Sequence, residues 1–480
     1  MFASSDYYMI GGDRAMPVNS FLNYHMSWKP EKHQLKRPIY LSLAERLEQD
    51  IKSGLLAPGT KLPPQRELAD FLDINFTTVT RAYSLCERKG LIYAVTGSGT
   101  FVSPNAKLPI TISLDNTPKN LIELGFIASF EQCNSMVVET VQEVSRKKYV
   151  EQLFGYDDPT GMQHQKMAGI NWMKPFGVET GPENMAIVSG ALNALAITLY
   201  ALFEPGDKIA VDTFTYSNFI ELARTFQIQL IAISGDEEGM LPAELYNQCI
   251  LSGIDGVFLM PSCSNPATVM ISQQRKKELA KVIREQNLIL IEDDVYAFLS
   301  AGLIKDYEGP MYQFIPDQTI YICGTSKSIC SGLRIAYMVF GEQFREKILK
   351  GIFNINVKTS SFDAEIITEL ILNGTAHQIV NEKKRLAECA NKLYQDCFSS
   401  HALNEHPYSY HRWLPISTKL SSEHLEASLK ERGIQVFHSD RFLCNTSEKK
   451  TFLRVALSSC STLEELEKGL HILKNALEFL

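Results

Sequence analysis

Apolar residues near the start of the chain recur with the spacing of an α-helix. A first helical face begins after Tyr40 and stops at Gly54, and its inward positions are Leu43, Leu47 and Ile51. A second, short helix follows the prolines at 63–64, and we expect it to bury Leu68, Phe71 and Leu72. A third runs from a cap at Asn75 to about Lys89, with inward candidates Val79, Ala82, Tyr83 and Leu85 or Cys86. Short apolar runs at 91–93 and 100–102 surround a glycine-containing tip and predict a hairpin.

The pattern of apolar residues changes after about residue 119. Continuous apolar stretches alternate with helical ones, which indicates a mainly parallel sheet covered on both faces. We expect seven strands, at 186–188, 208–211, 230–233, 256–260, 288–291, 319–322 and 335–340. The uncharged run 185–203 approaches the length of a membrane span, but its polar residues favour a buried strand, turn and helix.

These patterns predict an α/β protein of more than one domain, as its 480 residues also suggest. We expect an N-terminal extension (1–35), a winged helix-turn-helix (36–102), a linker with three prolines (103–119) and a large domain (120–480). The last part of that domain, about 375–480, mixes helices and strands and predicts a smaller α+β subdomain.

Charge and cysteine content limit which ligands and which cellular compartment suit this protein. The net charge is -8, yet residues 36–102 carry +2 and the remainder -10, so only the N-terminal part suits DNA phosphates. The ten cysteines form no CxxC pair and no zinc-binding spacing, which predicts reduced thiols in a cytoplasmic protein and no metal site. The N-terminus has no basic start followed by an apolar core, so we expect no signal peptide.

The predicted third helix would enter the major groove of double-stranded operator DNA. We expect contacts to phosphates and base edges from Arg66, Thr77, Thr78, Thr80 and Arg81. Gly97 and Gly99 would let the wing backbone approach the DNA closely. A helical interaction module without DNA affinity is the alternative. The string LPPQRELADFLDINFTTVTRAYSLCERKGLI followed by GSGTFV resembles the GntR family, which implies DNA binding through Arg66 and the Thr77-Thr78 region. Phe76 departs from the arginine often found there, which puts base preference in doubt.

Lys327, in GTSKSICSGLR, lies between a predicted strand and a turn rich in serine and glycine. A partly desolvated lysine has a neutral amine that can form a Schiff base. Seven residues later, Arg334 offers a planar fork that suits phosphate. Taken alone, this pair is more typical of a surface ion pair.

Other polar and aromatic residues follow other predicted strands. Asp293, in EDDVY, ends an apolar strand, where a carboxylate points into the ligand crevice and can keep a pyridine nitrogen protonated. Tyr296 and Asn265 could donate to a ring 3-oxygen, Tyr216 could stack on the ring, and the turn 189–192 could bind phosphate. Each has a structural alternative, as a turn, a helix start or a core aromatic. Their order along the chain favours the cofactor site.

Residues from about 122 to 480 resemble the fold-type-I aminotransferases. The resemblance implies pyridoxal 5'-phosphate (PLP), with Lys327 as the internal aldimine, Asp293 on the pyridine nitrogen, and Asn265 and Tyr296 on the 3-oxygen. It implies that the phosphate is held by Arg334 and by the turn Gly190, Ala191 and Leu192, and that Tyr216 stacks on the ring. It also implies a substrate-carboxylate role for Arg454 and contact with the neighbouring subunit's phosphate for Tyr156. Gly324 departs from the usual serine or threonine, and Thr325 or Ser326 is expected to substitute.

Both segments in one chain resemble the MocR subfamily, which implies a homodimer, often head-to-tail, in a bacterial cytoplasm. We expect a transcription regulator whose aminotransferase-like domain senses PLP or an amine or amino-acid effector at Lys327. The alternative is a working aminotransferase with an accessory N-terminal domain. The sequence does not identify the effector, the operator, the target genes, the direction of regulation, any turnover or the role of residues 1–35.

Overall fold

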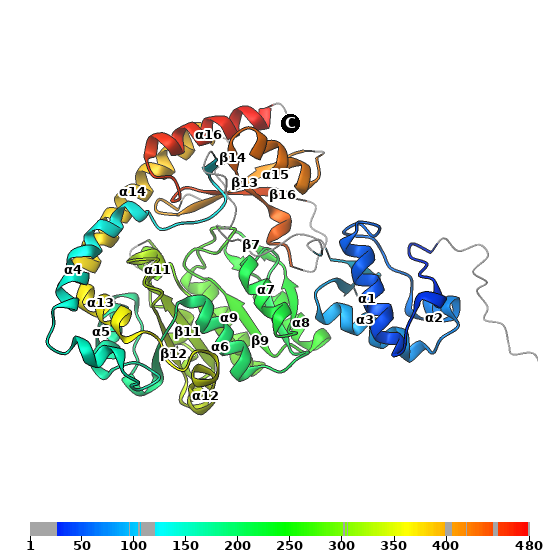
Figure 1. Ribbon diagram of the computed structural model, residues 1–480, viewed down its shortest axis with the longest axis horizontal. Coiled ribbons are helices and arrows are strands. Elements are labelled where there is room, and N and C mark those ends of the chain that lie inside the picture. Colours follow the sequence, from blue (N-terminus) through cyan, green and yellow to red (C-terminus); the bar gives the residue numbers. More distant parts are fainter. Residues whose placement is uncertain are drawn as a thin grey trace, which may run out of the picture.

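The computed structural model describes residues 26–95, 97–103, 106, 121–300, 303–304, 306–398, 406–418, 420–444 and 450–478. The described residues form a small helical body beside a much larger α/β body, and the small body lies next to the large body's α7 and α8 (Figure 1). Most of the expected extension and linker lies outside the described residues.

The small body has the order helix, helix, helix, hairpin. Its elements are α1 (Ile39–Lys52), α2 (Gln65–Leu72), α3 (Phe76–Arg88), β1 (Ile92–Val95) and β2 (Gly99–Val102). The strands are antiparallel, with Ile92 opposite Val102. The Asn75 side chain accepts a hydrogen bond from the Thr77 backbone amide, so the predicted cap of α3 is confirmed.

A single apolar core joins these three helices. The predicted inward positions of α1 are buried, as are Leu68, Leu72, Val79, Ala82, Tyr83 and Cys86. Phe71 was expected to face inward, and this is wrong, because it is 39% exposed. α2 has only eight residues, and Leu68, Ala69 and Leu72 already occupy its inward face.

A seven-stranded sheet forms the centre of the large body, and all seven predicted strands belong to it. Its spatial order is β4-β12-β11-β10-β9-β5-β6, and β12 runs opposite to the other six strands. The bounds are β4 (Met185–Val188), β5 (Lys208–Asp212), β6 (Gln229–Ile233), β9 (Gly256–Leu259), β10 (Ile289–Asp293), β11 (Thr319–Gly324) and β12 (Ala336–Phe340). The mainly parallel sheet is therefore confirmed.

Apolar cores cover both faces of this sheet, which explains its continuous apolar strands. In β11, Ile320 and Ile322 belong to one core, whereas Tyr321 and Cys323 belong to the other. Helices of the large body are α4 (Ser135–Ser145), α5 (Gln163–Met173), α6 (Ala191–Leu202), α7 (Ser217–Thr225), α8 (Pro242–Ser252), α9 (Gln273–Glu285), α10 (Ala297–Ser300), α11 (Thr325–Ser328), α12 (Arg345–Asn356) and α13 (Ser361–Leu372). β4 and α6 account for the uncharged run 185–203.

The C-terminal part mixes helices and strands, as expected. β13 (His411–Ile416), β16 (Thr451–Ala456) and β15 (Phe437–His438) form an antiparallel sheet. Around it lie α14 (Thr375–Phe398), α15 (Ser422–Glu431) and α16 (Leu463–Glu478) (Figure 1). β3 (Ile122–Glu123) pairs in parallel with β14 (Ile434–Gln435), which brings the start of the large body to the C-terminal part.

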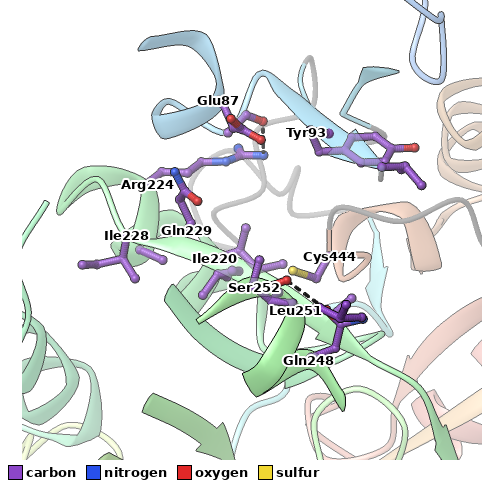
Figure 2. A pocket seen from close by; sticks show the side chains of 17 residues that line it. Glu87, Tyr93, Ile220, Arg224, Ile228, Gln229, Gln248, Leu251, Ser252 and Cys444 are labelled. Carbon is purple, nitrogen blue, oxygen red and sulfur yellow. Dashed lines mark hydrogen bonds between the residues drawn. The ribbon is translucent and has the colours of Figure 1, made fainter. Parts of the chain in front are cut away.

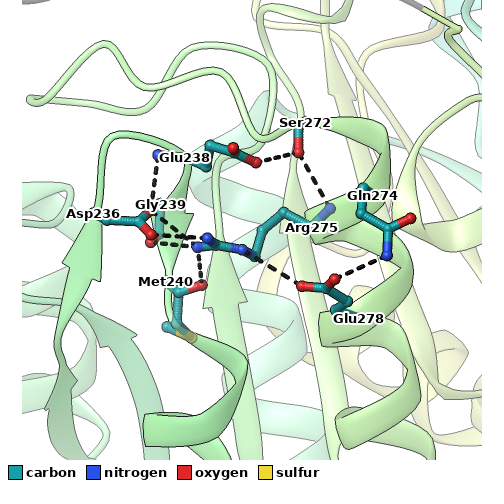
Figure 3. A network of polar contacts seen from close by, with 8 residues as sticks. All are labelled: Asp236, Glu238, Gly239, Met240, Ser272, Gln274, Arg275 and Glu278. Carbon is teal, nitrogen blue, oxygen red and sulfur yellow. Dashed lines mark hydrogen bonds and ion pairs between the residues drawn. The ribbon is translucent and has the colours of Figure 1, made fainter.

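A small hairpin beside α9 is held mainly by one arginine. Arg275 donates to Asp236 and to the carbonyl oxygens of Gly239 and Met240, at 2.8–3.1 Å (Figure 3). These residues belong to β7 (Gly235–Asp236) and β8 (Gly239–Met240). Within the described ranges, no helix has the length and apolar character to cross a membrane.

Candidate functional site

A cavity of about 410 Å³ opens where the C-terminal ends of β10 and β11 meet the start of α6. Such a position, outside the carboxyl ends of parallel strands, is where open α/β sheets bind ligands. Nine of the predicted site residues line it: Ala191, Leu192, Tyr216, Asn265, Asp293, Tyr296, Ser326, Lys327 and Arg334. Arg454 lines it as well, from β16.

Lys327 lies in the one-turn helix α11, directly after β11. Its amine donates to the carbonyl oxygens of Ile127 and Ala128. Burial, and then the nearby charge of Arg454, lower the pKa of Lys327 to about 7. Much of the amine is therefore neutral near pH 7, which is the form that attacks a carbonyl group.

Asp293 ends β10, and burial raises the pKa of its carboxyl to about 7. The Asp293 Oδ1 atom is buried and has no hydrogen-bond partner among the described residues. A buried polar atom without a partner is costly unless a ligand completes it. A ligand with a hydrogen-bond donor, such as a protonated ring nitrogen, would therefore satisfy Asp293.

Another part of the cavity, around Arg334, can hold an anion. Gly190 caps the N-terminus of α6 with a φ of 88°, and a Cβ atom there would lie 2.5 Å from Nη2 of Arg334. Arg334 also donates to the Ser326 hydroxyl at 2.8 Å. A guanidinium beside a helix N-terminus suits a phosphate group. Thr325 is buried and donates to the Ile335 carbonyl, so of the two expected substitutes Ser326 alone lines the cavity.

Arg454 connects the smaller C-terminal part to the cavity. Its Nη1 donates to Asn265 Oδ1 at 2.8 Å, and its Nη2 donates to the Gly125 carbonyl at 2.6 Å. Its Nε is buried without a partner among the described residues, and burial lowers the pKa of the guanidinium to about 10. Phe442 lies 4.6 Å from the guanidinium carbon. Such a desolvated arginine suits a carboxylate ligand.

Several residues that sequence reasoning missed support the site. The segment 126–128 forms one wall of the cavity, and Glu131 another. Lys383 in α14 and the Tyr410 hydroxyl both donate to the Lys327 carbonyl oxygen, at 3.3 and 3.2 Å. These residues carry no motif of their own, because the fold alone brings them from distant segments.

Tyr156 stands apart from the cavity. It is 91% exposed, and it does not line the cavity within its own chain. The neighbouring Phe154 is 72% exposed and stacks on Phe362 of α13. Two large aromatic side chains thus lie on the same surface segment.

The predicted DNA-contacting residues lie on α2, in the first half of α3 and at the tip of the β1–β2 hairpin. Arg66, Thr77, Arg81, Gly97 and Gly99 are exposed. Thr80 is half-buried and donates to Gln65 Oε1 at 2.8 Å, so its hydroxyl joins α2 to α3. The Arg66 guanidinium lies 5.7 Å from the Phe76 ring, and that of Arg81 lies 4.3 Å from the Tyr40 ring. Aromatic neighbours therefore orient both arginines.

Two protein families match this chain in separate segments. Residues 39–102 match "Bacterial regulatory proteins, gntR family", and residues 129–473 match "Aminotransferase class I and II". The first segment contains the three helices and the hairpin, and the second contains all the residues that line the cavity except 126–128.

Two curated relatives match over nearly the full chain, and a third matches over about two thirds of it. The uncharacterized HTH-type transcriptional regulator YdeF of Bacillus subtilis is 35% identical over 96% of this chain and 99% of its own. YdfD of the same organism, also named as an HTH-type transcriptional regulator, is 24% identical over 93% and 98%. The HTH-type transcriptional regulator NorG of Staphylococcus aureus is 22% identical over 65% and 75%.

Solved structures resemble the large body. A Pyrococcus horikoshii kynurenine aminotransferase matches with a TM-score of 0.68 and 19% identity, over 75% of this chain and 91% of that one. LysN, an α-aminoadipate aminotransferase of Thermus thermophilus, was solved with N-(5'-phosphopyridoxyl)-L-leucine and matches with a TM-score of 0.66 and 19% identity, over 75% and 93%. At this identity, both likenesses define the fold.

Proposed function

We propose a function from one premise: this chain belongs to the GntR-type transcriptional regulators that carry an aminotransferase class I and II segment, which is the architecture of the MocR subfamily. The proposal is that its large domain holds PLP and uses it to sense a ligand. The observation that carries the proposal is the buried Asp293 Oδ1 atom, which has no hydrogen-bond partner among the described residues, in the same cavity as Lys327.

The cavity's residues fit PLP at each end of the cofactor. Asp293 offers an acceptor for the ring nitrogen, and the Gly190 turn with Arg334 and Ser326 offers donors for the phosphate. Tyr216 lines the cavity with an aromatic ring, whereas Asn265 and Tyr296 offer polar groups for the 3-oxygen. When bound, PLP supplies an aldehyde and an electron-withdrawing ring.

The chain's own residues would capture an amine that carries a carboxylate. Lys327 releases and accepts a proton near pH 7, because its pKa is about 7. Arg454 would hold the carboxylate, and the carbonyl oxygens of Ile127 and Ala128 would receive the lysine amine when it is displaced. PLP itself is the other candidate signal, in which case cofactor-free and loaded forms differ in DNA affinity.

The cofactor assignment is tested on purified protein. Bound PLP should give visible absorption that borohydride removes, and peptide mass spectrometry should then locate the cofactor on Lys327. Lys327→Ala should lack the covalent link. Attachment to any other lysine would refute the assignment.

A working aminotransferase is the second candidate function, because Lys327, Asp293 and Arg454 all face one cavity. Specific binding to DNA upstream of its own gene supports the regulator. Multiple turnovers of transamination without DNA binding would support the enzyme.

A homodimer is part of the proposal, and exposed Tyr156 and Phe154 are the surface that supports it. We infer that Tyr156 reaches the phosphate site of the neighbouring subunit. In the described single chain, the winged helix lies against the large domain of the same chain. A head-to-tail dimer, in which each winged helix lies over the partner's large domain, therefore stays a prediction.

A further inference from the structure

One helix of the large domain lines both the cofactor cavity and the boundary with the winged helix. Tyr216 caps the N-terminus of α7, and Tyr216 and Asn218 line the cofactor cavity. Farther along the helix, Ile220, Ala223 and Arg224 line a second cavity, of about 470 Å³. Tyr216 and Arg224 are eight residues apart, which at 1.5 Å per residue is about 12 Å.

The second cavity lies between the two domains. Glu87 and Gly90 of the winged helix line it together with residues of α7, β6 and α8 (Figure 2). The Arg224 side chain extends from α7 toward Glu87, and its Nη2 donates to the Gly90 carbonyl at 3.5 Å. A Cβ atom at Gly90 would lie 2.5 Å from Arg224 Nε, so the Arg224 side chain lies directly against the Gly90 backbone.

This boundary contains open space. The cavity lies between the two domains, and the exposed side chains of Val95 and Leu251 line it. The contact uses the C-terminal end of α3 and β1, whereas the threonines predicted to contact DNA lie in the N-terminal part of α3. A tilt of the winged helix on this surface would therefore re-aim α3 without covering it.

α7 itself is firmly packed. Phe219, Ile220 and Ala223 are buried in the core beneath β5 and β6, and Arg224 is braced by Glu221 at 2.9 Å. A packed helix moves as a unit, so a displacement at Tyr216 is passed to Arg224 rather than absorbed.

We propose that α7 couples the cofactor cavity to the DNA-binding domain, with Tyr216 as the contact to the cofactor and Arg224 as the residue that positions the winged helix. The inference rests on the proposed function, since it assigns the route by which occupancy of the cavity alters operator affinity. Coupled sites typically change each other's affinity by roughly 5–150-fold.

Hydrogen exchange and DNA binding test the coupling in the full-length protein. PLP is added to cofactor-free protein, and amide exchange is followed in peptides covering 213–225 and 87–95. In the wild-type protein, PLP should slow amide exchange in both regions. It should also change the affinity for DNA upstream of the protein's own gene by about fivefold or more. Arg224→Ala should keep PLP absorption, DNA binding and the response in 213–225. It should lose the response in 87–95, and its DNA affinity should become the same with and without PLP.

Arg385→Ala is the matched control, because Arg385 also pairs with a glutamate three residues earlier on its helix. It should behave as wild type. A wild-type protein that responds in 213–225 but not in 87–95 would overturn the inference while leaving PLP binding intact. So would an Arg224→Ala variant whose 87–95 exchange equals wild type in both forms. Absence of PLP absorption would instead refute the proposed function, and the coupling with it.

Discussion

At the scale of single residues, burial acts in opposite directions on the two ionisable groups at the centre of the cavity. It raises the pKa of Asp293 and lowers that of Lys327, both to about 7, because it penalises whichever form is charged. Each group is therefore poised to change its protonation state near neutral pH.

Loading of PLP onto cofactor-free protein should depend on pH through Lys327. Since the neutral amine reacts, the loading rate should rise from pH 6 to about 8 and then level off. Stopped-flow absorbance would measure it, with Lys327→Ala as the unreactive control. A rate that keeps rising past pH 9 would indicate a lysine with an ordinary pKa.

Asp293→Asn should stabilise the cofactor-free protein at pH 8. Because the pKa of Asp293 is raised in the folded state, folded protein binds more protons than unfolded chain, and stability falls as pH rises from about 4 through 7. Removing the charge should recover up to about 4 kcal/mol at pH 8 and little at pH 4. Denaturant unfolding at the two pH values would measure this, and PLP retention should weaken in the same variant.

At the scale of elements, the β7–β8 hairpin depends on Arg275 of α9 (Figure 3). Arg275 is 11% exposed and bonds two backbone carbonyls, whereas its partner Asp236 is 46% exposed. Water screens the ion pair, so the carbonyl bonds carry most of the stabilisation.

Arg275→Ala should lower the free energy of unfolding by about 1–3 kcal/mol. Asp236→Ala should lower it by less than about 1 kcal/mol, since it leaves the carbonyl bonds in place. Chemical denaturation of both variants would compare them. Equal losses would show that the exposed ion pair matters as much as the buried bonds.

In the winged helix, Arg66 is the exposed cation of α2 that we expect on a phosphate. Arg66→Ala should weaken binding to all DNA sequences alike and reduce the slope of log affinity against log salt by about 0.9. Salt titrations of DNA binding would measure the slope. Arg385→Ala, in the large domain, should leave it unchanged, and an unaltered slope in Arg66→Ala would remove Arg66 from the interface.

At the scale of the whole molecule, a partner subunit would complete each cofactor site through Tyr156. Tyr156→Ala should bind PLP more weakly, because one phosphate donor is lost. Mixing Tyr156→Ala chains with Lys327→Ala chains should restore tight binding at one site per heterodimer, which PLP titration would detect. If Tyr156 acted within its own chain, mixing would restore nothing.

Much of the molecule could be predicted from the sequence, because continuous apolar strands have a clear signature. All seven sheet strands were predicted, and so was the cap at Asn75. The antiparallel direction of β12 was not, since apolar content does not encode direction. Nor was the exposure of Phe71, because a short helix has more apolar residues than its inward face holds.

Some residues of the candidate site could likewise be predicted from the sequence, and others could not. Residues that directly follow strands, such as Asp293 and Lys327, could be placed in one cavity, because parallel strand ends meet at one edge. Lys383 and Tyr410 could not, because their contacts to Lys327 arise from tertiary packing across more than 50 residues of chain. The approach of Arg224 to Gly90 likewise has no trace in either local sequence.

That approach sets a rule for building hybrid regulators. Gly90 has a φ of 66°, and any side chain there would meet Arg224. A foreign winged helix joined to this large domain therefore needs glycine at the turn after α3, or else a smaller residue than arginine on α7. A graft cut within the linker transfers the residue at position 90 without its partner on α7, so the natural unit of exchange includes the last turn of α7.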